Sequence, residues 1–177
     1  MNTIPPSGAA RLRIEPERPG DAPEISQLTT TAFAPMPFSA GDEARVVGAL
    51  REAGALTISL VAITAEDELV GHIAFSPVRI DGQPGDWYGL GPVSVAPAMQ
   101  GRGVGSALIH DGLERLRGLE AAGCVLLGNP DYYRRFGFLS DPALTYQGQP
   151  NRYFQHLVLK GPPAKGDASF HPAFDAP

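Results

Sequence analysis

Residues 90–106 read Leu-Gly-Pro-Val-Ser-Val-Ala-Pro-Ala-Met-Gln-Gly-Arg-Gly-Val-Gly-Ser, a strand-like run that passes through a glycine-rich loop into a helical pattern. Glycines at positions 101, 103 and 105 let the main chain approach a ligand without interference from side chains. The helix that follows directs the positive end of its dipole at the same place. This order of elements is typical of a diphosphate-binding site, so we expect the chain to hold a cofactor derived from a nucleotide.

The composition is that of an ordinary globular domain. The chain has 177 residues, of which 43% are hydrophobic and 19% are charged, enough to bury a core without disulfides or metals. We expect one domain over residues 11–160, with residues 1–10 and 161–177 as flexible or loosely docked tails. The N-terminal stretch has no basic start and no apolar run, so we predict no signal peptide, no membrane partner and a cytoplasmic location.

Charge and ligand-type residues exclude several classes of function. The net charge is −5, and the 14 lysines and arginines are dispersed along the chain, so nucleic acid is not an expected partner. The four histidines lack ligand spacing, and we therefore predict no metal site. The single cysteine, Cys124, lies in an apolar run and is interpreted as an inert core thiol.

Apolar periodicity predicts the elements that precede the loop. Pro92 has no amide hydrogen for a sheet ladder and follows Gly91, which predicts a bulge in the strand just before the loop. Asp21 is predicted to be the N-cap of the first helix. The expected elements are a strand at 12–14, helices at about 21–33 and 42–53, and antiparallel strands at 57–64, 69–80 and 87–95.

The segment after the loop predicts a long amphipathic helix over 103–119, whose apolar side includes Leu119. A short buried strand at 123–127 follows, and because a helix connects it to the previous strand we expect the two to be parallel. A brief helix at 131–136 and a strand at 153–160 complete the pattern.

Two common nucleotide-binding motifs do not fit the loop. The Rossmann fingerprint requires Gly-x-Gly-x-x-Gly, and here Ala107 and Leu108 follow Ser106 where that spacing fails. A P-loop requires Gly-Lys-Ser/Thr, which the chain does not contain. A nucleotide-binding oxidoreductase is therefore disfavoured.

The motif Gln100-x-x-Gly103-x-Gly105 is similar to the signature of the GNAT superfamily of acyl-CoA-dependent N-acetyltransferases. Two further segments resemble that family in the same order. Leu90-Gly-Pro-Val-Ser-Val95 resembles its bulged fourth strand, and Tyr132-Tyr-Arg-Arg-Phe-Gly-Phe138 resembles its aromatic-Tyr-x-x-x-Gly-Phe segment. With the predicted order of elements, the resemblance covers about residues 11–160.

The resemblance implies an α/β (α+β) fold with a mixed, mostly antiparallel central sheet that is splayed between its fourth and fifth strands and flanked by about four helices. It implies an acetyltransferase that uses acetyl-CoA as cosubstrate, without a metal. The implied reaction is direct attack of a primary amine on the thioester in a ternary complex, with no acyl-enzyme.

The family's cofactor-binding roles carry over to three segments. Main-chain groups of the fourth strand would pair with the pantetheine arm, and the amides of the loop and first helical turn would take the pyrophosphate. Asn129 follows the fifth strand, in a loop that is shorter than in many relatives. The implied cofactor-binding residues are Val93, Ser94, Val95, Gln100, Gly101, Arg102, Gly103, Val104, Gly105, Ser106, Asn129 and Tyr133.

Tyr133 stands at the position of the family's general acid. When the tetrahedral intermediate collapses, the departing thiolate needs a proton, and a phenol held near the sulfur can donate it. Packing of the Tyr133 ring under the cofactor is the alternative interpretation. Tyr132 is interpreted as core or cofactor wall. Arg134 and Arg135 are interpreted as solvated charges, with attraction to the cofactor's phosphates left open.

The sequence departs from the family pattern at the general base, because the fourth strand carries no acidic residue or histidine. Deprotonation of the amine would fall to a water chain, or to Tyr88, Glu43 or His72, among which the sequence does not choose.

The acceptor site is expected between the loop that holds Met36 and Phe38 and the turn near 146–153. These segments are apolar and aromatic, so a polycation is not favoured as acceptor, whose identity stays open. A non-catalytic acyl-CoA-binding sensor or interaction module remains as an alternative function, and a homodimer is left open.

Overall fold

Two long antiparallel strands, β3 (Leu69–Ile80) and β4 (Gln83–Val95), form the centre of the fold. The computed structural model describes residues 11–175, so the tail predicted at 1–10 lies outside the described residues. The sheet runs in the order β1-β2-β3-β4-β5-β7, with β6 and β8 added beside the end of β3. The other strands are β1 (Arg13–Pro16), β2 (Ile58–Ile63), β5 (Gly123–Leu127), β6 (Leu144–Tyr146), β7 (Phe154–Val158) and β8 (Gly166–Ser169).

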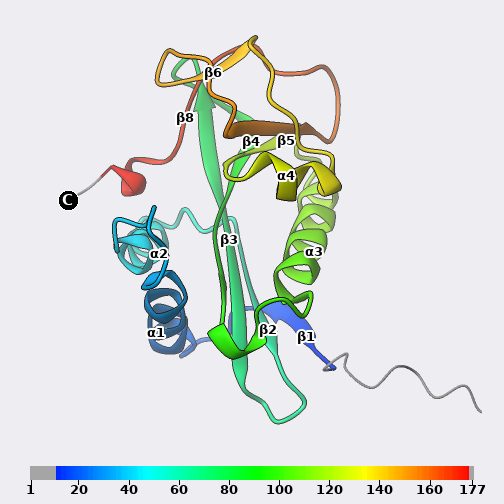
Figure 1. Cartoon of the computed structure of the whole chain (residues 1–177). Coiled ribbons are helices and arrows are strands. Elements are labelled where there is room, and N and C mark those ends of the chain that lie inside the picture. Colours follow the sequence, from blue (N-terminus) through cyan, green and yellow to red (C-terminus); the bar gives the residue numbers. More distant parts are fainter. Residues whose placement is uncertain (1–10, 176–177) are drawn as a thin grey trace, which may run out of the picture.

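Helices cover both faces of this sheet (Figure 1). Helices α1 (Ala22–Phe33) and α2 (Glu43–Glu52) lie on one face, and α3 (Val104–Gly118) lies on the other. A short fourth helix, α4 (Pro130–Tyr133), continues into a 3₁₀ turn, η2 (Arg134–Phe136). The predicted α/β class, the mostly antiparallel sheet and the four helices are confirmed.

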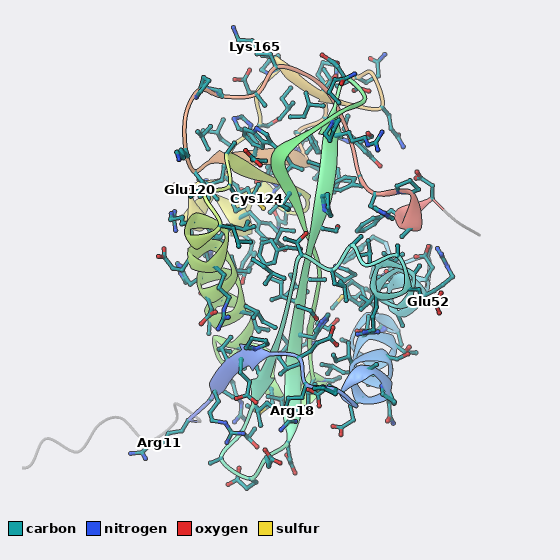
Figure 2. The ribbon with its side chains drawn as sticks, turned by 180° about the vertical axis from the view of Figure 1, so that it is seen from behind. Arg11, Arg18, Glu52, Glu120, Cys124 and Lys165 are labelled. Carbon is teal, nitrogen blue, oxygen red and sulfur yellow. The ribbon has the colours of Figure 1, made fainter. Side chains whose placement is uncertain are left out.

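The main core lies between α3 and the sheet. Gly112 lets α3 approach closely, because a Cβ at this position would lie 2.3 Å from the ring of the fully buried Phe75. Cys124 belongs to the same core, and Figure 2 places it in the interior of the molecule. It is a free cysteine, and burial raises the pKa of its thiol, which agrees with its interpretation as an inert core residue.

The sheet opens where β4 leaves β5. The two strands are parallel and pair only over Trp87–Gly89 and Gly123–Val125. Just beyond this contact the β3–β4 register shifts, so that Gly91 and Pro92 together stand opposite Ala74. Gly91 has φ +134°, a conformation that side-chain-bearing residues rarely adopt. The predicted bulge is therefore present, and beyond it the β5-facing edge of β4 lacks a strand partner.

The segment after residue 160 differs from the expected loose tail. β8 pairs with both β3 and β6, and the Asp81 carboxylate accepts a hydrogen bond from the amide of Asp167 at 2.8 Å. The following 3₁₀ turn, η3 (Pro172–Phe174), packs against α2, as Figure 1 shows near the C-terminal end. Between them, Phe170 covers β4: a Cβ on Gly89 would lie 2.9 Å from its ring.

Candidate functional site

A cavity of about 330 Å³ lies where the glycine loop enters α3. The walls come from the end of β4, the loop, the first turn of α3 and the α4–η2 segment. The lining residues are Val95, Met99, Gln100, Gly101, Gly103, Val104, Gly105, Ser106, Tyr132 and Arg135. The cavity therefore joins two segments that the sequence singled out separately.

Local interactions fix the conformation of the glycine-rich loop. Gly103, the N-cap of α3, has φ +84°, which favours glycine because other residues are strained there. The Gln100 side chain donates from Nε2 to the carbonyl of Val95 at 3.1 Å and so ties the loop to the end of β4. The first turn of α3 carries no acidic side chain. An anion in this cavity would meet amide groups and a positive helix end without a competing carboxylate.

Not every predicted cofactor residue lines this cavity. Val93, Ser94, Arg102, Asn129 and Tyr133 are outside its lining. The hydroxyl of Ser94 points the other way, donating to Thr29 Oγ1 on α1 at 3.3 Å. Residues 93–95 have no β5 partner, because β5 has parted from β4 here, although the Val95 carbonyl accepts from Gln100 Nε2.

Asn129 has a structural role in this fold. It is the N-cap of α4, where its Oδ1 accepts a hydrogen bond from the amide of Asp131 at 3.0 Å. Pro130 occupies the first helical position, which suits a residue without an amide hydrogen. The side chain therefore fixes the start of α4 and does not line the cavity.

Tyr133 packs on β5 beside the opening of the sheet. A Cβ on Gly128 would lie 2.4 Å from its ring, and the rings of Tyr132, Phe136 and Phe138 surround it at centroid distances of 5.0 to 6.2 Å. Burial raises the pKa of Tyr133 to about 12. The phenol is therefore protonated at neutral pH, as a proton donor must be.

The three base candidates have different surroundings. Tyr88 packs against the core on the α3 face. Glu43, at the start of α2, accepts a hydrogen bond from Ser39 Oγ at 2.5 Å. His72 is fully buried, with Nε2 2.8 Å from Ser59 Oγ. Burial lowers the pKa of His72 to about 3, with Arg51 as a smaller cause. An inaccessible histidine cannot take a proton from an incoming amine, so His72 is not the base.

His72 should instead make stability depend on pH. The pKa of His72 is about 3 in the folded state and has its ordinary value of 6.5 in the unfolded chain. Between these two pH values the unfolded chain therefore binds a proton at His72 and the folded chain does not. The contribution of His72 to the free energy of unfolding is fully present above pH 6.5 and is lost progressively as the pH drops toward 3. Between pH 7 and 5 the loss should be about 2 kcal/mol.

Urea unfolding of the wild type and of His72→Gln at both pH values measures this effect. The variant should lose about 2 kcal/mol less than the wild type over the interval, whatever its stability at pH 7. An identical pH dependence in the two proteins would contradict the assignment.

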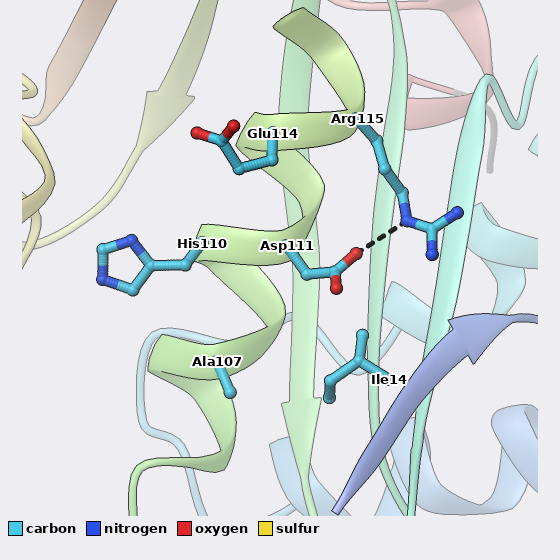
Figure 3. A pocket seen from close by; sticks show the side chains of 6 residues that line it. All are labelled: Ile14, Ala107, His110, Asp111, Glu114 and Arg115. Atoms are coloured by element: carbon cyan, nitrogen blue, oxygen red, sulfur yellow. Dashed lines mark hydrogen bonds and ion pairs between the residues drawn. The ribbon is translucent and has the colours of Figure 1, made fainter. Parts of the chain in front are cut away.

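A larger hollow of about 580 Å³ lies elsewhere, in the open groove between β1 and α3. Figure 3 shows Ile14 of β1 on the same side of α3 as Asp111 and Arg115, with the side chains of His110 and Glu114 directed to the other side of the helix. Asp111 accepts a hydrogen bond from Arg115 Nε at 2.6 Å, so these two side chains form an ion pair with each other. This groove lies on the outer side of α3 and contains none of the predicted site residues.

Within residues 11–175, no three or more His, Cys, Asp or Glu side chains are grouped closely enough to hold a metal ion. In the same range, no helix is both long enough and apolar enough to cross a membrane.

Comparison with known proteins agrees with this geometry. The model of the Acetyltransferase (GNAT) family matches residues 22–138. The uncharacterized N-acetyltransferase YhbS of Escherichia coli K12 is 39% identical over 127 residues, which are 72% of this chain and 73% of YhbS. YjhQ of the same organism, another uncharacterized N-acetyltransferase, is 36% identical over 137 residues, 75% of this chain and 71% of YjhQ.

Solved structures have the same fold. A GNAT family acetyltransferase from Brucella melitensis, in complex with acetyl-CoA, is 50% identical with a TM-score of 0.83, covering 94% of this chain and 99% of that one. E. coli YhbS in complex with CoA has a TM-score of 0.84 at 33% identity, covering 99% of this chain and 97% of YhbS. With its splayed sheet, its loop cavity and these relatives, the chain belongs to the GNAT family of N-acetyltransferases.

Proposed function

We propose that the protein transfers an acetyl group from acetyl-CoA to a primary amine by direct attack in a ternary complex. The observation that carries this proposal is the cavity at the start of α3, which adjoins the end of β4 where the sheet opens. The acetyl-CoA and CoA held by the B. melitensis and E. coli relatives support it.

The donor is proposed to lie along three features. Its diphosphate occupies the loop cavity, where the amides of 102–106 and the positive end of α3 favour an anion. Its pantetheine arm lies along Val93–Val95, in the place that β5 would occupy beside β4, where the Val95 carbonyl also accepts a hydrogen bond from Gln100 Nε2. The thioester then lies in the opening between β4 and β5, near Tyr133. Asn129 supports the donor indirectly, as the cap of α4.

Tyr133 is proposed as the general acid. The amine nitrogen attacks the thioester carbonyl, the intermediate collapses with cleavage of the C–S bond, and the phenol gives its proton to the departing sulfur. The phenolate then regains a proton from solvent, while the proton lost by the attacking nitrogen leaves to water. His72 is fully buried, Tyr88 is half-buried against the core, and Glu43 is hydrogen-bonded to Ser39. We therefore propose that a water chain removes it.

The acceptor is proposed to approach from the face opposite α3. Half-buried aromatic rings lie on this side: Tyr146 is stacked on the buried Phe154 at 5.4 Å, and Phe170 meets Tyr146 edge-on at the same centroid distance. Phe38, in the loop between α1 and α2, is 79% exposed. Such walls favour an amine carried on an apolar or aromatic body over a polycation.

Two measurements test the proposal. Calorimetry on the purified protein should detect CoA binding, and thiol release from acetyl-CoA should accelerate with members of an amine panel that runs from phenylethylamine to spermidine. Tight CoA binding without turnover on any amine would favour the alternative, a non-catalytic acyl-CoA sensor. No CoA binding would remove both functions.

A further inference from the structure

Arg135 is the one lining residue of the loop cavity that carries a formal charge. From sequence it is an ordinary solvated charge on a short helix. In the fold it instead lines the same cavity as Gly101 and 103–106, across from the first turn of α3. No carboxylate lies within ion-pair distance of it among residues 11–175.

The guanidinium is held in place by its neighbour Tyr132. Arg135 Nε donates to the carbonyl oxygen of Tyr132 at 2.8 Å, and its central carbon lies 4.4 Å from the centre of the Tyr132 ring. These two contacts order the side chain in advance, which reduces the entropy lost when it binds a ligand. The Nη groups make no hydrogen bond to any described residue and are free for an anion, since a guanidinium has five donors in a planar fork.

The carbonyl that Arg135 contacts belongs to the peptide bond between Tyr132 and Tyr133. An anion bound to the guanidinium therefore acts on the backbone that carries the proposed general acid. Tyr132 itself extends to the other wall, because its hydroxyl lies 3.7 Å from where a Cβ on Gly105 would be. The α4–η2 segment and the start of α3 thus meet across the cavity through one tyrosine and one arginine.

We propose that Arg135 binds the diphosphate of the donor and, through the Tyr132 carbonyl, positions Tyr133 when the donor is bound. This inference rests on the proposed function. It makes Arg135 a positioning residue as well as a phosphate ligand, so that occupancy of the loop cavity orders the turn at 130–136.

The chain offers a matched control in Arg134, which has the same charge one residue earlier but is outside the cavity lining. By calorimetry, Arg135→Gln should weaken the binding of both CoA and dephospho-CoA about tenfold, since charge-assisted hydrogen bonds to phosphate are lost. Arg134→Gln should change either affinity less than twofold. A loss confined to CoA would place the contact on the 3′-phosphate and overturn the assignment to the diphosphate.

Positioning is tested by hydrogen exchange of residues 130–136 at saturating CoA. The wild type and Arg134→Gln should gain protection there, whereas Arg135→Lys, which keeps the charge but lacks the Nε–H donor, should bind CoA within threefold of wild type without that gain. Equal protection in all three proteins would overturn the positioning role. If the wild type binds no CoA, the proposed function fails first; if it binds and Arg135→Gln binds equally well, only this inference fails.

Discussion

Replacing Gly105 with aspartate should abolish CoA binding while leaving the protein at least as stable as the wild type. Gly105 is the second residue of α3 and lines the loop cavity. A Cβ at this position fits, with its nearest neighbours, Tyr132 Oη and Val95 Cγ2, at 3.7 Å. A carboxylate there would favour the helix by about 0.3–1 kcal/mol through the dipole, and would repel the donor's diphosphate in the same space.

Calorimetry should show CoA affinity reduced by about 100-fold or more in Gly105→Asp, which corresponds to about 3 kcal/mol. Gly105→Asn is the matched control, because it has nearly the same size without the charge, and its affinity should fall by less than about tenfold. Thermal melting should show no decrease for the aspartate variant. Equal losses for both variants would indicate that size and not charge blocks the cavity, and no loss in either would place the diphosphate elsewhere.

Replacing Tyr133 with phenylalanine should lower kcat by about 100-fold, the lower end of what a positioned general acid contributes. The ring contacts with Gly128, Phe136 and Phe138 do not involve the hydroxyl, so the fold and the KM for acetyl-CoA should change little. Since burial raises the pKa of Tyr133 to about 12, wild-type activity should not decline through loss of this proton at neutral or mildly alkaline pH.

Steady-state kinetics with an acceptor from the amine panel measures this effect. Tyr132→Phe provides the contrast, because Tyr132 lines the loop cavity and its variant should affect KM for acetyl-CoA more than kcat. A kcat of Tyr133→Phe equal to that of the wild type across the pH range would assign the departing thiolate's proton to another donor.

The sequence allowed the central part of the fold to be predicted because its signals are local. The helix predicted from 103 begins at Val104, with Gly103 as its N-cap at φ +84°. Gly91-Pro92 marks the bulge, because proline cannot donate to the ladder. The apolar stripe of α3 marks the face that packs on Phe75, although Leu119 is 55% exposed because the helix ends at Gly118.

The strands β6 and β8 could not be predicted in the same way. Leu144–Tyr146 is too short for a pattern, and Gly166–Ser169 contains residues that disfavour strands. Their pairing depends on distant partners: Asp167 accepts from Thr145 Oγ1 at 2.8 Å, and its amide bonds the Asp81 carboxylate. Such contacts are properties of the assembled fold.

Individual side-chain contacts show the same limit and one missed signal. Asn129 was predicted to contact cofactor, yet Asn-Pro-Asp is itself a helix-start signature that explains its cap. Asp21 is at the predicted N-cap position, but its carboxylate bonds the amide of Arg18 at 2.7 Å and does not cap α1. The place of Arg135 in the cavity lining depends on how α4 docks across from α3, which no local pattern encodes.

The late position of β8 has a consequence for how the protein is made. Asp81 and Asp167 are 86 residues apart. When a nascent chain has emerged from the ribosome only as far as β7, Trp87 and Phe154 are already present. Phe170, which packs against their cluster, is still missing. Exposed apolar surface of this kind attracts chaperones or other unfinished chains. During synthesis, the face of the sheet opposite α3 is thus the last to be covered.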